Sequence, residues 1–137
     1  IDRYLILQKH DKRQSEVTAI STHPDMNADL AMAGLGALSQ TTRLDTFRLL
    51  VRHEPDGLPA GEVARQLDVP QNTMSAHLAI LARSGLVRSE RRSRSIIYRA
   101  DLDALRGLML FLVKDCCEGR AELCHPLADE LLACRAA

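Results

Sequence analysis

The sequence predicts a mainly α-helical fold with one β-hairpin wing, the architecture of a winged helix-turn-helix domain. Two short stretches with apolar residues at helical spacing, Ala60–Leu67 and Gln71–Arg83, are separated only by residues 68–70, which is the pattern of a helix-turn-helix. Two β-prone runs follow directly, Leu86–Ser89 and Ser95–Arg99, and such a pair favours a β-hairpin. The inward-facing positions of the two helices are Val63, Leu67, Met74, Leu78 and Leu81.

The size and composition of the chain fit one domain with tails. Of its 137 residues 46% are hydrophobic but only 3% are aromatic, so we expect a core of aliphatic side chains packed between helices. Residues 27–118 are expected to form the domain, and residues 119–137 a thiol-bearing tail. Residues 1–26 are polar without a clear period, and we expect a disordered or added segment there, with Met26 as a natural start.

Two more helices are expected before the helix-turn-helix. The first begins near Leu30, and its apolar or small residues recur at helical spacing, at Leu30, Ala33, Gly34, Ala37 and Leu38. The second is expected to be capped by Thr41 or Thr42 and to end at the breaker Glu54–Gly57. Its apolar face consists of Leu44, Phe47, Leu50 and Val51.

A long helix and a short one are expected after the hairpin. Asp101 is placed to cap a helix over Leu102–Cys117, and Gly119 is placed to stop it. One side of this helix carries Leu102, Leu105, Met109 and Leu112. A last short helix is expected over Leu127–Cys134.

The charges are unevenly distributed although the formal net charge is zero. Between Arg83 and Arg99 the chain has six arginines and one acid, Glu90, whereas the part after Asp115 is mainly acidic. The hairpin is therefore expected to be a local basic patch.

The second helix of the helix-turn-helix has an outward face suited to reading DNA. In this motif the second helix enters the major groove, where Gln and Asn side chains pair with adenine and Ser and Thr contact bases or phosphates. The outward positions are Gln71, Asn72, Thr73, Ser75, Ala76 and His77. A solvated helix face would look the same, so this pattern alone does not decide the function.

The hairpin tip favours DNA binding over a merely solvated surface. Arg91, Arg92 and Arg94 supply cations where backbone phosphates or the minor groove would lie. Single-strand binding is disfavoured because the patch has only Tyr98 as an aromatic platform, whereas single-strand binders stack several bases. Double-stranded DNA is the expected partner.

The stretch from about Leu35 to Cys124 resembles the ArsR family of metal- and metalloid-responsive repressors. Its most specific piece is QNTMSAHLAILARSGLV, where Ser75, His77, Leu78, Leu81, Gly85 and Leu86 match the family's recognition helix and exit turn. The resemblance implies a homodimer formed by the first and last long helices and release of operator DNA when an effector binds. Gly34, Ala37 and Gly107 would then be interface contacts or, equally, internal packing.

Three departures from the family pattern bear on the effector. Many relatives have a Cys-x-Cys ligand pair in the first helix of the helix-turn-helix, but this chain has Ala60, Gly61 and Glu62 there. The acid-and-histidine zinc pattern of the last long helix is also missing, since Leu102–Cys117 has no histidine. Finally, Ser93 stands at the wing tip where a glycine is common.

Three cysteines near the C-terminus, Cys116, Cys117 and Cys124, form a candidate effector site. Adjacent helical residues point about 100° apart, so the first two converge only if the helix frays, and Gly119 permits a turn that returns Cys124. Three soft thiolates suit trivalent arsenic or antimony, which bind three sulfurs in a pyramid. Some ArsR-type repressors are similar in having such a site, so arsenite or antimonite is the expected effector.

Several alternatives remain open for these thiols. Zinc or cadmium would use the same three cysteines with His125, although zinc cysteines are usually two to four residues apart. A redox switch would join Cys116 or Cys117 to Cys124. Inert thiols are a further alternative, which suits Cys134 on an apolar face. A thiol-dependent enzyme with His125 as base is the remote alternative, because no oxyanion-binding loop accompanies the cysteines.

The sequence also indicates a compartment. No segment is long and apolar enough to span a membrane, and the first ten residues do not have the order of a signal peptide. All four cysteines lie near the C-terminus, where bridging them would constrain little of the fold. A cytoplasmic, reducing location is expected.

Overall fold

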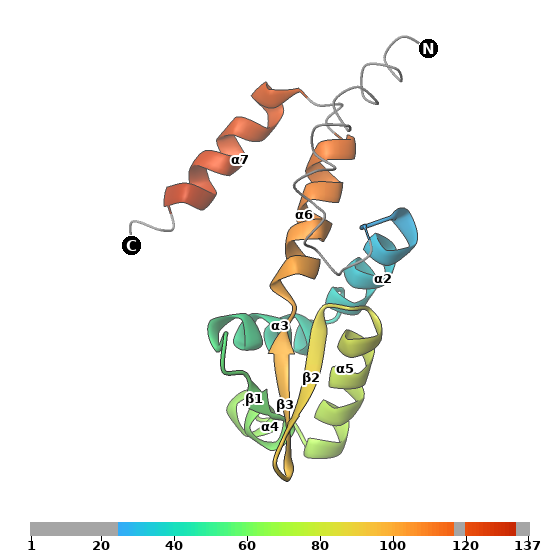
Figure 1. Cartoon of the computed structure of the whole chain (residues 1–137), viewed down its shortest axis with the longest axis vertical. Coiled ribbons are helices and arrows are strands. Elements are labelled where there is room, and N and C mark those ends of the chain that lie inside the picture. The colour runs from blue at the N-terminus through green and yellow to red at the C-terminus, as the bar shows by residue number, and fades with distance from the viewer. Residues whose placement is uncertain (1–24, 117–119, 134–137) are drawn as a thin grey trace.

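The computed structural model describes residues 25–116 and 120–133 and has the predicted winged helix-turn-helix architecture (Figure 1). Helices α2 and α3 precede the helix-turn-helix of α4 and α5, and a hairpin of β2 and β3 leads into α6 and α7. The bounds are α2 Ala28–Leu38, α3 Thr41–Arg52, β1 Leu58–Pro59, α4 Ala60–Leu67, α5 Gln71–Arg83, β2 Val87–Arg92, β3 Ser95–Ala100, α6 Leu102–Cys116 and α7 Ala121–Ala133.

The helix-turn-helix has the boundaries that the sequence predicts. Asp68 ends α4 in the left-handed conformation with φ of 53°, which an aspartate tolerates better than most residues. Pro70 then precedes α5 and cannot continue the previous helix. The turn between the two helices is therefore set locally, by residues 68–70.

The caps of the first two helices differ in part from the prediction. The Asn27 side chain accepts a hydrogen bond from the Leu30 backbone N–H at 2.9 Å and begins α2 two residues before the expected start. The prediction that Thr41 or Thr42 caps α3 is wrong, because Gln40 is the capping residue and accepts from the Arg43 N–H at 2.9 Å. Thr41 is already the first helical residue.

The sheet has three antiparallel strands in the order β1-β3-β2. The hairpin strands are longer than predicted and leave only Ser93 and Arg94 as the turn, since Arg92 pairs with Ser95. Ser93 has φ of 57°, a left-handed conformation that favours glycine. This conformation accounts for the glycine that the ArsR resemblance leads one to expect at the position. Strand β1 was not predicted, and it joins the sheet by pairing Leu58 with Tyr98.

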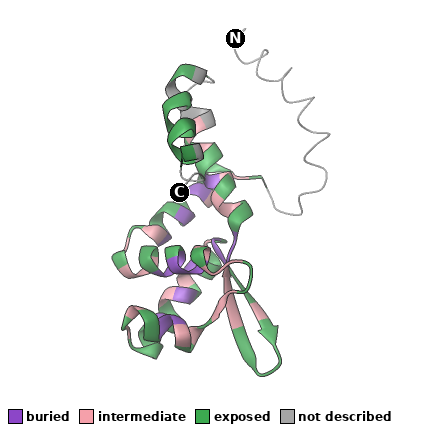
Figure 2. Ribbon diagram, turned by 90° about the vertical axis from the view of Figure 1, so that its left-hand side faces the viewer, coloured by how far each residue is buried: buried purple, intermediate pink, exposed green. Residues whose placement is uncertain are grey.

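The core lies between α3, α4, α5 and the base of the hairpin, and α2 and α6 add Ala31, Ala37 and Leu108 to it (Figure 2). Four of the five positions predicted to face inward from α4 and α5 are fully buried, and Leu67 is half-buried. In α3 the exposed Leu44 is a departure from the predicted face, and buried Thr46 and Leu49 were not expected. The largest buried side chains are Leu50, Met74, Leu78, Leu81 and Leu86.

Helix α6 begins as predicted but presents a different face to the domain. Asp101 caps it by accepting a hydrogen bond from the Ala104 N–H at 3.0 Å. Leu108 is buried, and its side chain lies 3.6 Å from where a Cβ on Gly34 would be. The predicted side remains mostly uncovered within the chain, with Leu102, Met109 and Leu112 exposed.

The three small residues named as interface or packing positions all have neighbours within the single chain. Gly34 and Ala37 are buried in the α2 surface that faces the domain, and Gly107 lies against Met26. Gly34 and Ala37 are buried within the single chain, whereas Gly107 is half-buried, so for these residues the structure favours the packing alternative. A dimer would have to use other side chains of the same helices.

The C-terminal helix α7 is longer than the predicted Leu127–Cys134 helix. It begins six residues earlier, at Ala121, and contains Pro126. Within the described residues, no helix is long and apolar enough to cross a membrane.

Candidate nucleic-acid interface

The outward face of α5 is where the sequence places it. Gln71, Asn72, Thr73, Ser75 and Ala76 are exposed, while the opposite face of the helix is buried in the core. His77 is half-buried, and its Nδ1 atom is enclosed without a hydrogen-bond partner among the described residues. Five of the six proposed contact residues thus line one accessible polar face.

The three arginines of the wing tip do not have equal surroundings. Arg91 and Arg94 are exposed, and across residues 25–116 and 120–133 no ion pair is recorded for either. Arg92 donates to Glu90 at 3.1 Å and to the backbone carbonyl of Asp56 at 3.3 Å. Arg91 and Arg94 are therefore the tip cations available to a phosphate, whereas the charge of Arg92 is partly neutralised.

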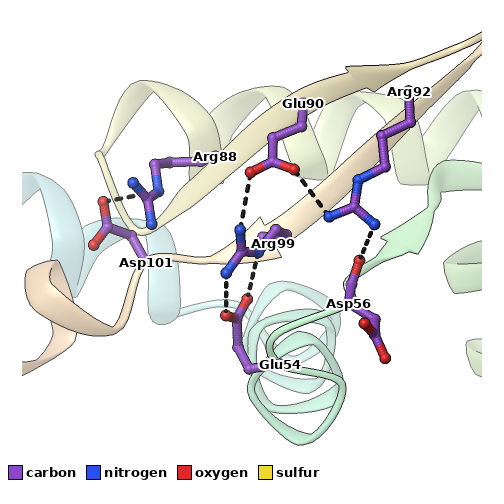
Figure 3. A network of polar contacts seen from close by, with 7 residues as sticks. All are labelled: Glu54, Asp56, Arg88, Glu90, Arg92, Arg99 and Asp101. Carbon is purple, nitrogen blue, oxygen red and sulfur yellow. Dashed lines mark hydrogen bonds and ion pairs between the residues drawn. The ribbon is translucent and has the colours of Figure 1, made fainter.

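Arg99 is the centre of a polar network that the sequence reasoning missed (Figure 3). Its guanidinium donates to both carboxylate oxygens of Glu54, at 2.8 and 3.3 Å, and to Glu90 at 2.9 Å. The hydrogen bonds that Arg99 donates to Glu54 and Glu90 raise the pKa of Arg99 above its usual value, and the bond to Glu90 lowers the pKa of that carboxyl. Arg99 was predicted only as part of the basic patch.

The alternation of a strand is the signal that could have found part of this network. Successive side chains of a strand point to opposite faces, so Arg88, Glu90 and Arg92 share one face of β2. That pattern places an acid between two arginines. Glu54 could not have been found this way because it lies 45 residues from Arg99 in the sequence.

A second ion pair connects the base of the wing to α6. Arg88 of β2 lies 3.5 Å from the carboxylate of Asp101, whose side chain is only 4% exposed. Asp101 is also the cap of α6. The wing and the long C-terminal helix therefore share one buried carboxylate.

The surface of α4 beside the turn carries a local charge pair rather than a basic patch. Arg65 and Gln66 both donate to Glu62, and these hydrogen bonds, led by that of Arg65, lower the pKa of Glu62 to about 2. An open hollow lies next to this pair, between α4 and the first residue of α5. The charge of Arg65 is therefore partly neutralised by Glu62.

The candidate thiol site lies outside what the structure describes. Cys117 and Cys134 are outside the described residues. The backbone of Cys116 ends α6 and that of Cys124 lies in α7, but their side chains are not among those described. Residues 25–116 and 120–133 contain no other group of three metal-binding side chains.

The fold, the exposed polar face of α5 and the wing define a winged helix-turn-helix protein. A family described as a helix-turn-helix domain matches residues 38–90. The chain is 27% identical over 94 residues to the transcriptional activator HlyU of Vibrio cholerae. The matched region covers 69% of this chain and 84% of that protein.

Solved structures agree with this class. An ArsR-like transcriptional regulator from Rhodococcus sp. RHA1 is 28% identical with a TM-score of 0.62, covering 77% of this chain and 93% of that one. A homodimeric winged helix-turn-helix DNA-binding domain from Mycobacterium bovis is 26% identical with a TM-score of 0.54, covering 69% and 88%. The protein is therefore a helix-turn-helix regulator with ArsR-like structural neighbours.

Proposed function

We propose that the protein is a homodimeric repressor that binds double-stranded operator DNA through α5 and the wing and releases it when trivalent arsenic binds Cys116, Cys117 and Cys124. The exposed polar face of α5 and the exposed Arg91 and Arg94 at the wing tip carry the DNA-binding part. The matched relatives are transcriptional regulators, which favours binding over catalysis. The Vibrio relative is named an activator, so repression is our proposal for this chain.

The apolar surface that one chain leaves uncovered supports the proposed homodimer. Met32 and Leu35 on α2 are exposed, as are Leu102, Met109 and Leu112 on α6. Exposed apolar residues gathered on two helices mark an interaction site, and the Mycobacterium bovis relative is described as homodimeric. A dimer through α2 and α6 would present two α5 helices to half-sites about 34 Å apart, one turn of DNA.

The wing contribution predicts a specific dependence on salt. Each phosphate contact that is lost lowers the slope of log affinity against log salt by about 0.9. We expect Arg91→Gln and Arg94→Gln each to reduce the slope by about this amount on an operator duplex. Arg65→Gln on α4 is the comparison outside the wing, and it is expected to change the slope less because Glu62 already pairs with Arg65. Equal slopes for all three variants and the wild type would contradict a wing that contacts phosphates.

The effector part rests on the chemistry of the donor set. Three thiols occur within nine positions, and thiophilic trivalent arsenic or antimony takes three sulfur ligands. Cys116 is the last residue of α6 and Cys124 is the fourth residue of α7, so the two ligands flank the joint between these helices. Bound arsenic would hold the two helix ends together.

The release of DNA requires a difference in affinity between two states of the protein. Helix α6 runs from the thiols to Asp101, where it meets the wing through Arg88. A shift of α6 on effector binding would therefore act on the wing and on the apolar α6 surface together. This is the route by which we expect the thiol site to move two α5 helices out of register.

A titration of arsenite against the reduced protein on its operator tests the effector. We expect one arsenic per chain and release of the duplex by the wild type, but no release after Cys116→Ser. Cys134→Ser is the matched control and should respond like the wild type. Unaltered release by Cys116→Ser would overturn the arsenic site. Release by zinc or cadmium, lost on His125→Ala, would instead support the four-ligand alternative, and release by an oxidant alone would support the redox alternative.

A further inference from the structure

The wing projects beyond the part of the sheet that supports it. Strand β1 pairs with β3 only at Tyr98 and Ile97, so the tip from Arg91 to Ser95 has a partner on one side only. A two-stranded ribbon is marginally stable by itself. Some other contact must fix the direction in which the tip points.

The register of the hairpin creates a charge conflict that Glu54 resolves. Arg88 and Arg99 are directly opposite each other in the β2–β3 ladder, and like charges at such positions destabilise a sheet. Arg88 lies against Asp101, and Arg99 lies against Glu54 and Glu90. The side chains of Arg99 and Glu54 are only 21% and 13% exposed, so this pair is well shielded from solvent.

The same network reaches the wing tip from the α3–β1 connection. Glu54 holds Arg99, Arg99 holds Glu90, and Glu90 holds Arg92, whose guanidinium also donates to the Asp56 carbonyl (Figure 3). Both ends of this chain of contacts therefore lie in the connection after α3. It ties the outer part of the wing to the body of the domain, where α5 also packs.

We propose that Glu54 and Arg99 are positioning residues for DNA binding, which hold the wing at the angle that brings Arg91 and Arg94 to the phosphate backbone. Arg92 is then an anchor of the wing rather than a phosphate contact. This inference rests on the proposed function, because it takes DNA as the partner of the wing. It assigns a role in DNA binding to an acidic residue that itself repels phosphates.

The direction in which DNA affinity changes when Glu54 is replaced distinguishes a positioning role from an effect of net charge. Removing a negative charge near a phosphate-binding surface strengthens binding when only net charge matters. If Glu54 positions the wing, its removal has the opposite effect, because Arg91 and Arg94 lose their fixed direction.

The test compares Glu54→Gln with Asp56→Asn, which removes the same charge from the same connection. Asp56 holds Arg92 through its backbone carbonyl, so its side chain can change without breaking that contact. We expect Glu54→Gln to weaken operator binding about 10-fold, on the scale of coupled neighbouring groups. Asp56→Asn is expected to bind as tightly as the wild type or more tightly. Tighter or unchanged binding by Glu54→Gln would overturn the inference.

Two further measurements distinguish positioning from a general loss of stability. Combining Glu54→Gln with Arg91→Gln and Arg94→Gln should reduce operator affinity by less than the sum of the separate losses. Once the wing is no longer held in place, Arg91 and Arg94 contribute less to binding. Arg99→Lys keeps the charge but cannot bind both carboxylates in the same fork, so it should weaken binding like Glu54→Gln. Additive losses, or wild-type binding by Arg99→Lys, would contradict the role. If the wild type itself fails to bind duplex DNA, the proposed function is wrong as well.

Discussion

Replacing Gly57 with alanine is expected to destabilise the domain by about 2–5 kcal/mol, from backbone strain together with overpacking. Gly57 has φ of 74°, which only glycine adopts freely. A Cβ atom would lie 2.6 Å from the backbone oxygen of Tyr98 and 2.6 Å from Cγ of Arg99. Because the Tyr98 oxygen belongs to a strand, relief requires that β3 or the α3–β1 connection move.

Gly85 is the matched control for this substitution. It also has positive φ, 83°, but a Cβ there would have no neighbour within 4 Å. Gly85→Ala should therefore cost only the strain, about 1–2 kcal/mol. Urea unfolding of the two variants and the wild type measures the difference. Equal losses for Gly57 and Gly85 would mean that the close approach of the connection to β3 is not maintained in solution.

The elements that sequence reasoning predicted best are those whose ends are set by neighbouring residues. The bounds of α4 and α5 follow from the turn at residues 68–70, where Asp68 takes the left-handed conformation and Pro70 blocks the continuation of a helix. The polar face of α5 follows from helical periodicity in the same way. Local rules sufficed because no distant partner is needed to choose between these conformations.

The features that the sequence did not predict depend on contacts between residues that are far apart in the chain. Strand β1 has two residues, too few for any periodic pattern, and it exists because Leu58 pairs with Tyr98. Arg92 resembles Arg91 and Arg94 in the sequence, and it differs from them because the Asp56 carbonyl, 36 residues away, accepts from it. A count of arginines therefore overestimated the positive charge available at the wing.

The exposed apolar face of α6 shows another limit of prediction from sequence. The periodic apolar face at Leu102, Met109 and Leu112 is real, but it does not face the core of its own chain. Periodicity indicates that a face will be covered without indicating by what. The buried contact of α6 instead uses Leu108 against Gly34, two residues whose proximity the sequence does not reveal.

Met109→Glu is expected to separate the proposed dimer into monomers and to weaken operator binding by about 100-fold or more, since two linked binding sites gain 10²- to 10⁴-fold over one. Met109 is 38% exposed in the single chain, so a glutamate there can keep its carboxylate in solvent in the monomer. In a dimer through α6 the same position would be buried, and a buried unpaired carboxylate is strongly unfavourable.

Leu44→Glu is the matched control, because Leu44 has almost the same exposed fraction, 39%, but lies on α3. Sedimentation of both variants reports the mass of the assembly, and titration of an operator with two half-sites reports the affinity. We expect the Leu44 variant to stay dimeric and to bind as the wild type does. A single half-site sharpens the comparison, since a monomer that has lost only its partner should bind it as the wild type does.

A Met109 variant that remains dimeric would show that α6 is covered by something other than a second copy of the chain. A monomer that still bound the full operator tightly would show that the two α5 helices do not act together.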